Sequence, residues 1–429
     1  MKGLVMKKQT NLFLAFMLML ALALTGCAGT QQTQAEEKGD DGSVAVENIR
    51  QLVAADNKIA RTLMWNTSVK QDYTVEYRLK GTQESRSVKA TDASFEDAGR
   101  SYLQYSVSIE GLRPASEYEY RINTAKNKGA WHKLRTEDGK KLSALIFPDS
   151  QSADYSGWQT LAREAYKRNS DSDLFINMGD LVDNGQDSNQ WQKWFTSVSP
   201  FSDSVPLAPL LGNHEAYSLQ WKECFPTAYT HLFNVPQNGL KDYKNQFYSF
   251  DYGPVHFVVL DTNFPEMKNF QPQLLADELP WLEKDLAASK AKWKVVLMHR
   301  DIFLYGFGPQ SGRAQTKTQL LDFSYQLMPV FEKYGVDAVL TAHLHTYRRR
   351  VPLQNFAPAP QGQGITYILT GVAGDVRYPK LWGDFEWDAG RAPQPETANY
   401  MTLIADDKIL EFKAFLPDGK EFDSVKLEK

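Results

Sequence analysis

The sequence contains few cysteines, few histidines and no surplus of basic charge. Its 429 residues include two cysteines and seven histidines, and 48 lysines and arginines against 52 aspartates and glutamates leave a formal net charge of −4. This charge balance offers no basic surface that would neutralise a phosphate backbone, which argues against nucleic acid as a general partner. A mean hydropathy of −0.46 argues against a protein with several membrane spans. The length is typical of two or three globular domains.

The N-terminus has the pattern of an export signal. Three lysines precede an apolar run at 12–24, which is shorter than the about 20 residues that a membrane-spanning helix needs. The run ends in Leu24-Thr25-Gly26-Cys27, which resembles a bacterial lipobox. The resemblance implies that residues 1–27 are a lipoprotein signal peptide, that Cys27 is lipidated, and that the protein is exported and anchored to the membrane of the cell envelope. Plain secretion and a retained anchor are the alternatives.

Neither the segment after the signal nor the second cysteine indicates a structural element. Residues 28–44 are mostly polar, with almost nothing to bury, and indicate a disordered tether. Cys224 has no partner once Cys27 is lipidated, so the mature protein has no internal disulfide. We expect Cys224 to be buried as an apolar residue rather than to be a reactive thiol.

Residues 45–138 alternate apolar and polar side chains in runs such as 73–79 and 103–109, which predicts β-strands buried on one face. The segment 111–121 turns at Pro114 and continues with paired tyrosines, Tyr118 and Tyr120. It resembles the tyrosine corner of a fibronectin type III domain, which implies an all-β sandwich. Because no catalytic cluster occurs in this region, we expect it to be a spacer or a packing partner.

From residue 141 to 429 the pattern changes to short apolar runs that alternate with helical periodicity. Alternating strands and helices predict a layered α/β domain, and two further regions, 246–261 and 400–427, predict antiparallel strands. The predicted core strands are 142–147, 174–178, 207–211, 295–298 and 336–341, and the predicted helices lie at 158–166, 190–199, 275–289 and 317–334.

Polar residues that can bind a metal ion follow each core strand. Ligand sites of open α/β sheets lie at the carboxyl ends of their strands, so we expect these side chains to meet. Oxygen ligands and imidazoles without thiolates favour manganese, iron or zinc. The residues are Asp149, Asp180, Asn213, His299, His343 and His345.

Four short motifs carry a family resemblance: GDLVDNG at 179–185, GNHE at 212–215, MH at 298–299 and AHLH at 342–345. Together they resemble the calcineurin-like metallophosphoesterases. With the β-rich region in front of them, the arrangement most resembles the purple acid phosphatases and their bacterial relatives. The resemblance implies a four-layer α/β/β/α metallophosphoesterase sandwich at 141–429, preceded by the fibronectin type III-like domain at 45–138.

The resemblance also implies roles for these residues and a cofactor of two metal ions, divalent or of mixed valence, drawn from iron, manganese and zinc. Asp180 would bridge both ions, and Asn213 and His214 would contact the substrate phosphate. His214 would also be a general acid for the leaving oxygen, with metal-bound hydroxide as the nucleophile. The remaining ligands would be Asp149 and His345 for the first ion, and Asn213, His299 and His343 for the second.

Two residues depart from the purple acid phosphatase pattern. Gln151 stands where many metallophosphoesterases have a histidine and purple acid phosphatases a glycine, and whether this neutral amide binds the first ion is left open. Asp183 stands where purple acid phosphatases have the tyrosine that gives them their colour, so we expect no purple band. It resembles instead an aspartate of Ser/Thr phosphoprotein phosphatases and is predicted to orient His214 and raise its pKa, with capping of a loop as the alternative.

The substrate side is less defined. Arg300 and Arg313 border a segment rich in glycine and aromatics and are candidates for phosphate binding, with solvated side chains as the alternative. The aromatics Trp382, Phe385 and Trp387 can stack on a base or sugar, but packing on the core is the commoner role.

We therefore predict a metal-dependent, extracytoplasmic hydrolase of phosphate monoesters with a small phosphorylated substrate. A phosphodiesterase would use the same metal ligands, and a surface binding protein with a vestigial phosphatase fold is the alternative from another class. The sequence leaves the oligomeric state open.

Overall fold

A computed structural model of the chain describes residue 44 and residues 46–429. The predicted signal peptide, its Cys27 and nearly all of the predicted tether lie outside the described residues. Among the residues that are described, none of the helices combines the length and the apolar character that crossing a bilayer requires.

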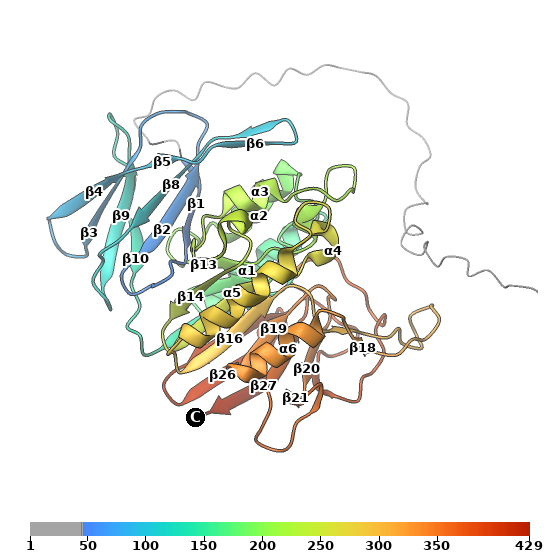
Figure 1. The fold of residues 1–429 in the computed structure, drawn as a ribbon. Helices are drawn as coiled ribbons and strands as arrows, with labels where there is room; N and C mark the ends of the chain where they lie inside the picture. The colour runs from blue at the N-terminus through green and yellow to red at the C-terminus, as the bar shows by residue number, and fades with distance from the viewer. Residues whose placement is uncertain (1–43, 45) are drawn as a thin grey trace, which may run out of the picture. The chain divides into compact units, whose positions relative to one another are not determined.

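The N-terminal region consists of β-strands, as the alternating pattern predicts (Figure 1). Side chains such as Trp65 and Val75 point between its two main layers and form a separate hydrophobic core. The strands are β1 (Glu47–Leu52), β2 (Arg61–Asn66), β3 (Thr74–Leu79), β4 (Ser85–Lys89), β5 (Thr91–Asp92), β6 (Phe95–Asp97), β7 (Arg100–Tyr102), β8 (Gln104–Ile109), β9 (Glu117–Asn123) and β10 (His132–Arg135).

The two tyrosines of the predicted corner both make defined bonds. The Tyr118 hydroxyl accepts a hydrogen bond from the Arg113 N–H at 2.9 Å, which closes the turn at Pro114. The Tyr120 hydroxyl donates to the Asp203 carbonyl at 2.7 Å, so it ties the N-terminal region to the α/β domain. The likeness to fibronectin type III domains itself stays a prediction.

The α/β domain contains two facing sheets with helices outside them, which confirms the predicted layered α/β architecture. Its part of the first sheet has the order β27 (Glu421–Glu428), β26 (Ile409–Phe415), β25 (Tyr400–Ala405), β11 (Leu142–Phe147), β12 (Leu174–Asn177) and β13 (Leu207–Pro209). The second sheet has the order β14 (Tyr248–Tyr252), β15 (Val255–Leu260), β16 (Trp293–Met298), β19 (Ala338–Thr341), β23 (Thr366–Thr370), β20 (Tyr347–Arg350) and β24 (Asp388–Arg391).

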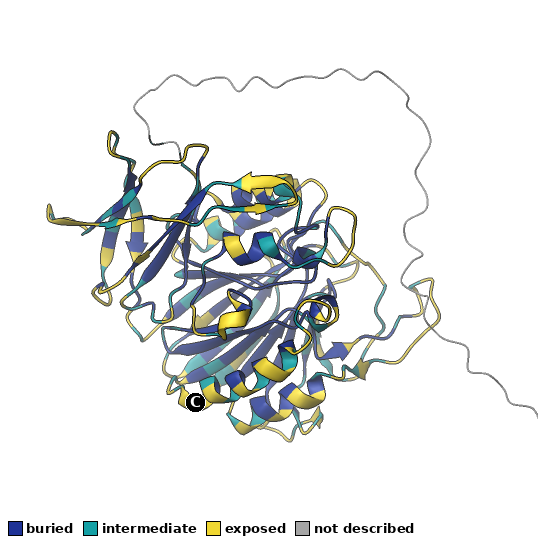
Figure 2. Cartoon of the chain, turned by 45° about the horizontal axis from the view of Figure 1, so that its top comes forward, coloured by how far each residue is buried: buried dark blue, intermediate teal, exposed yellow. Residues whose placement is uncertain are grey.

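Period-two alternation within buried strands explains the layers. On β16, Val295 and Leu297 join the core between the sheets, whereas Val296 and Met298 join the core under the outer helices. Figure 2 shows the resulting pattern, with buried strands inside and exposed outer faces on the helices. The helices are α1 (Ser156–Arg168), α2 (Ser188–Val198), α3 (Thr227–Leu232), α4 (Phe264–Met267), α5 (Leu274–Ala288) and α6 (Ser324–Lys333), with 3₁₀ turns η1 (His214–Ala216) and η2 (Lys241–Tyr243).

The helix predicted over 317–334 begins later than the pattern indicates. Residues Gln319–Leu320 form a short strand, β18, that pairs with β17 (Phe303–Leu304). This pairing satisfies the backbone of the segment before α6, so the helix starts only at Ser324. A second short hairpin joins β21 (Leu353–Gln354) to β22 (Ala357–Pro358).

The N-terminal region is a packing partner of the α/β domain, because the first sheet runs through both. Strand β1 pairs in parallel with β13, with Leu52 opposite Leu207. Beside this seam the fully buried Arg50 donates from Nε to the Leu232 carbonyl at 2.9 Å and from Nη2 to Gln104 Oε1 at 2.9 Å. Burial lowers the pKa of Arg50 to about 9. Neutral acceptors from both regions therefore hold this cation, which fixes their contact.

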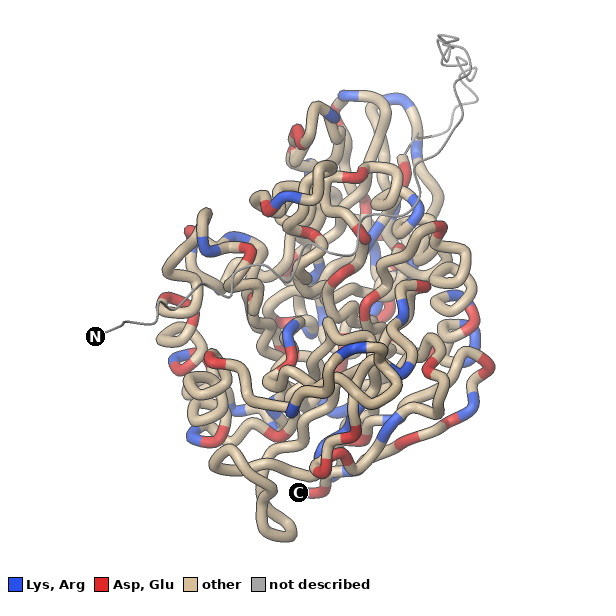
Figure 3. The backbone as a smooth tube through the Cα atoms, turned by 90° about the vertical axis from the view of Figure 1, so that its right-hand side faces the viewer, with Lys and Arg blue, Asp and Glu red and all other residues tan. Residues whose placement is uncertain are grey.

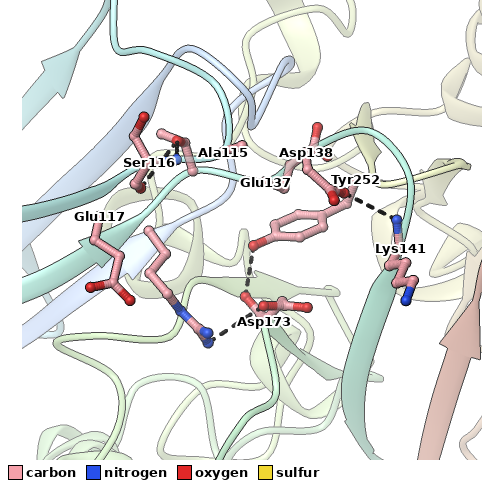
Figure 4. Close-up of a pocket in the computed structure, with 10 residues that line it drawn as sticks. Ala115, Ser116, Glu117, Glu137, Asp138, Lys141, Asp173 and Tyr252 are labelled. Atoms are coloured by element: carbon pink, nitrogen blue, oxygen red, sulfur yellow. Dashed lines mark hydrogen bonds and ion pairs between the residues drawn. The ribbon is translucent and has the colours of Figure 1, made fainter.

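A cavity of about 250 Å³ lies at the other end of the same junction (Figure 4). The Tyr252 hydroxyl donates to the Asp173 carbonyl at 2.9 Å, and Glu137 Oε2 accepts from the Gly253 N–H at 3.1 Å. Arg135 lies 3.4 Å from the Asp173 carboxylate. The polar lining of this cavity thus bonds the N-terminal region to the residue before β12 and to the turn after β14.

Charged residues of both signs are mixed along the surface seen in Figure 3. The predicted free thiol, Cys224, is only half-buried, so it is less buried than we expected. Burial still raises the pKa of its thiol to about 11, so the thiol remains protonated at neutral pH.

His256 on β15 is expected to make the stability of the protein depend on pH. Burial lowers the pKa of His256, but hydrogen bonds to Asp251 at 2.7 Å and Asp285 at 2.8 Å raise it to about 9. Because the pKa of His256 is higher in the folded state, protonated His256 stabilises the protein below about pH 6.5. This stabilisation is lost as the pH rises through 9. After a reduction for the solvent exposure of Asp251, protonated His256 contributes about 2 kcal/mol to the free energy of unfolding.

Thermal unfolding of wild type and His256→Gln at pH 6 and pH 10 checks this prediction. We expect the variant to unfold several degrees lower at pH 6 and the gap to narrow at pH 10. A gap of the same size at both pH values would contradict the charged role of His256.

Candidate metal centre

The six predicted ligands follow the carboxyl ends of strands in both sheets. Asp149, Asp180 and Asn213 come after β11, β12 and β13 of the first sheet, and His299 comes directly after β16 of the second. His343 and His345 follow β19. Because the two sheets face each other, these loops meet at one edge of the sandwich.

The side chains form two groups with the spacing of a metal site. The first group is Asp149, Asp180 and His345, and the second is Asp180, His299 and His343; within each group the ligand atoms lie within 4.8 Å of one another. Asp180 is common to both groups. The sixth residue, Asn213, places its Oδ1 3.1 Å from His299 Nε2, next to the second group.

Three of these residues have a left-handed backbone conformation, which is uncommon for residues other than glycine. The φ angles are 45° for Asp180, 74° for His343 and 51° for His345. Strain of this kind persists only where the surrounding structure enforces it, and it is frequent at functional sites. The left-handed conformation therefore costs conformational energy at these residues, and it directs their side chains toward one centre.

Two of the imidazoles are oriented by bonds on the far side of the ring. His299 Nδ1 lies 2.9 Å from the Met178 carbonyl, and His345 Nδ1 lies 2.6 Å from the Val376 carbonyl. Donation from Nδ1 leaves each Nε2 facing the centre, as metal-binding histidines usually do. His299 Nε2 then lies 3.2 Å from Asp180 Oδ2, and His345 Nε2 lies 3.7 Å from Asp149 Oδ1.

The charges of the centre also suit bound cations. Burial raises the pKa of Asp149 well above its ordinary value, and the Asp180 carboxylate adds to the rise. Burial lowers the pKa of His345 to about 4 and lowers that of His343 well below its ordinary value. His343 and His345 are thus neutral imidazoles, the form that binds metal, whereas burial lowers the pKa of His299 but the Asp180 and Asp149 carboxylates raise it to about 9. Two adjacent buried carboxylates repel each other unless a cation lies between them.

One buried nitrogen supports the same conclusion. His343 Nδ1 is buried and has no hydrogen-bond partner among the described residues, whereas buried polar atoms are nearly always bonded. The donor set of carboxylates, an amide oxygen and imidazoles matches the ligands of manganese, iron and zinc. The residues present thus fit two metal ions that share Asp180.

Glu215 connects the loops that carry these ligands, and we did not predict this role from the sequence. Its buried carboxylate accepts hydrogen bonds from the backbone N–H groups of two loops. The donors are Asp180 at 3.1 Å, Leu181 at 2.8 Å, Val182 at 3.2 Å and Gly212 at 2.8 Å. Gly212 is required here, because a Cβ at this position would collide with the Asp180 backbone nitrogen and carboxylate.

His214 lies beside the centre, with its backbone N–H donating to Asp180 Oδ1 at 2.8 Å. Its Nδ1 lies 2.7 Å from the backbone carbonyl of Asp183 and 3.5 Å from the Asp183 carboxylate. The shorter contact orients the ring, so Asp183 positions His214 mainly through its main chain. The pKa of the Asp183 carboxyl is itself raised by burial, against the effect of the His214 charge.

Gln151 joins the same network. Its Nε2 lies 3.3 Å from Asp183 Oδ1 and 3.3 Å from His214 Nε2. Its Oε1 is buried without a hydrogen-bond partner among the described residues. The side chain is therefore within the centre, with one acceptor free for an additional partner.

One of the two candidate arginines contacts the second metal-sized group. Arg300 lies 2.6 Å from Glu266 and 3.0 Å from His343 Nε2, so its charge is already shared within the protein. Arg313 lies over the Phe307 ring at 4.7 Å, on an exposed loop.

Comparison with known proteins agrees with this geometry. Residues 142–347 match the calcineurin-like phosphoesterase family, and residues 46–136 match the purple acid phosphatase N-terminal domain. An acid phosphatase of Aspergillus ficuum is 28% identical over 286 residues, which span 46% of this chain but only 44% of that protein. The acid phosphatase type 7 of Homo sapiens is 26% identical over 340 residues, which span 73% of this chain and 74% of that protein.

A solved structure extends the likeness to the whole fold. The purple acid phosphatase from seeds of yellow lupin (Lupinus luteus) superposes with a TM-score of 0.75 at 18% identity, covering 90% of this chain and 74% of that one. The predicted resemblance is confirmed by the domain matches and by this fold. Residues 142–347 therefore form a calcineurin-like phosphoesterase domain behind a purple acid phosphatase N-terminal domain, and the chain has a purple acid phosphatase-like fold.

Proposed function

We propose that this protein hydrolyses phosphate monoesters outside the cytoplasm, at a centre of two metal ions. The observation that carries the proposal is Asp180, whose carboxylate belongs to both metal-sized groups of ligands. Asp149 and His345 would complete the first site, and Asn213, His299 and His343 would complete the second. When bound, two such cations would supply the positive charge that polarises a phosphoryl group and activates water at neutral pH.

His214 is proposed to bind the substrate phosphate and to protonate the leaving oxygen. Its side chain is 20% exposed, so a ligand can reach it. Two bonds fix its position, one from its backbone to Asp180 and one from Nδ1 to the Asp183 carbonyl. The ring is thereby held with Nε2 toward the centre, where Gln151 contacts it and where a substrate oxygen would replace that contact.

The proposed location rests on the N-terminal sequence. Residues 1–27 combine a basic start, an apolar run and a lipobox-like end, and Cys27 is the proposed site of lipidation.

Hydrolysis of matched esters tests the proposed function. Protein that starts after Cys27 is purified, loaded with manganese, iron or zinc, and assayed with p-nitrophenyl phosphate and with bis(p-nitrophenyl) phosphate. We expect two metal equivalents per chain and a higher kcat/KM for the monoester. A preference for the diester would replace monoesterase by phosphodiesterase, and no turnover with any of the three metals would overturn the enzymatic function.

A further inference from the structure

A second cavity, of about 540 Å³, lies beside the proposed metal centre. It is formed by the loops around residues 308–310 and 378–384 together with strand β20 and residues 391–396. Its lining includes two aromatic side chains, Tyr378 and Trp382. The predicted roles of the metal centre do not use this cavity.

Both aromatic side chains contact the segment that carries His343 and His345. The Tyr378 ring stacks on the His345 ring with 5.1 Å between centroids and 22° between planes. Trp382 donates from Nε1 to the Leu344 carbonyl at 2.8 Å. A ligand bound in the cavity therefore lies next to the site where a phosphate would react.

The wall around Trp382 is part of the folded structure. Its ring stacks on Phe307 with 5.8 Å between centroids and 12° between planes, and the Gly308 N–H donates to the Leu381 carbonyl at 3.0 Å. A Cβ on Gly308 would lie 2.9 Å from the Trp382 carbonyl oxygen, so the two loops approach closely because this residue is glycine. These contacts hold the indole in one orientation.

The other aromatics of the same stretch are used differently. Phe385 and Trp387 pack against Phe303, and both, like Trp382, are partly buried against the core under the outer helices. Tyr378, in contrast, is 42% exposed. Of the three aromatics in this run, Trp382 is the one that also lines the cavity.

The polar groups of the cavity are largely neutralised by one another. Arg391 bonds to Asp384, and Arg348 lies 3.3 Å from Glu396. Lys380 is exposed and makes no ion pair with any other residue in 46–429. Besides this ammonium group and the two ion pairs, the cavity presents two aromatic rings and the amides of Gln310 and Gln394, which suit a planar ring with hydrogen-bonding groups.

We propose that this cavity binds the base of a nucleoside phosphate, with the ester phosphate at the metal centre. The inference rests on the proposed function for the position of the phosphate. The cavity volume lies within the range that small organic ligands occupy, and is larger than a short alkyl leaving group would fill. Tyrosine and tryptophan can stack on any base. We therefore expect the enzyme to prefer esters that carry a base over esters that do not, with little preference for which base it is.

Two substrates isolate the base. Adenosine 5′-monophosphate and ribose 5-phosphate have the same sugar and the same scissile bond, so the ratio of their kcat/KM values reports the base alone. We expect a ratio of about 10 for the wild type, because stacking is the main difference. We expect Trp382→Leu to lower the ratio to about 1 and Trp382→Phe to keep most of it.

Trp382→Leu and Trp382→Phe are a matched pair, since both lose the bond to the Leu344 carbonyl and only one loses the ring. Equilibrium dialysis with adenosine, which has no phosphate, gives a readout that is independent of turnover. The wild type and Trp382→Phe should bind adenosine, and Trp382→Leu should not. Equal use of both esters by the wild type would overturn the base-binding cavity but leave the proposed function intact. If the metal-loaded wild type hydrolysed neither ester but still bound adenosine, the proposed function would be overturned instead.

Discussion

Replacement of Asp180 by alanine is expected to lower kcat for phosphate ester hydrolysis at least about 1,000-fold, which corresponds to about 4 kcal/mol of transition-state stabilisation. Asp180 is the residue that both metal-sized groups share. Its loss leaves each group with two of its three clustered side chains and separates the two sites. We therefore expect metal analysis to show less than one equivalent per chain after dialysis, against two for the wild type.

Two further variants separate the effect of Asp180 from general damage. Asp180→Asn keeps an oxygen that can accept the His214 N–H but removes the charge, so we expect a folded protein with weak metal binding. His345→Ala removes a ligand from the first group only and should lose about one equivalent. Asp407, which is exposed and distant from these groups in sequence, provides the control Asp407→Ala. Full activity with two bound metals in Asp180→Ala would contradict the shared site.

The ligands could be predicted from the sequence because each of them combines two local signals. Asp149, Asp180 and His299 are residues of metal-binding type, and each comes at or shortly after the end of an apolar run that forms a strand. The carboxyl ends of such strands converge in any layered α/β fold, so the approximate position follows without knowledge of the register. Amphipathic periodicity likewise predicted the buried face of α1, which includes Trp158 and Leu161.

Features that depend on distant contacts could not be predicted in this way. Strand β13 has three residues, and its partner β1 lies more than 150 residues away, so nothing local indicates that the first sheet continues into the N-terminal region. The orientation of His214 is a similar case. A carboxylate at position 183 suggests an ion pair, but the shorter contact is made by the backbone carbonyl, whose position depends on the turn that follows β12.

Glu215 was missed because its role is to accept backbone hydrogen bonds, and no side-chain pattern reveals this. Within the GNHE motif it stands among candidate site residues, and an acidic residue there invites a catalytic interpretation. The structure instead places its carboxylate between four backbone N–H groups, buried at 1% exposure. Burial raises the pKa of Glu215 to about 7, with the Asp180 carboxylate adding to the rise.

Replacement of Glu215 by alanine is expected to reduce both stability and metal binding. The change leaves four buried N–H groups without an acceptor, and we expect a loss of about 5 kcal/mol of unfolding free energy, near the upper end for single substitutions. The loops that it joins carry Asp180 and Asn213, so the metal-binding geometry should relax as well. Differential scanning calorimetry of the metal-free protein should show a decrease in Tm of about 6 °C.

Glu215→Gln provides the matched test of this clamp. Glutamine keeps the volume and one carbonyl oxygen, which can accept from two of the N–H groups, but its NH₂ group faces the others. We therefore expect a loss of stability about half that of Glu215→Ala. Glu110→Ala, an exposed substitution, is the control for removal of one negative charge. A Tm for Glu215→Ala within about 2 °C of wild type would mean that the two loops hold their positions without the carboxylate, and that the backbone conformation of Asp180 is fixed by other contacts.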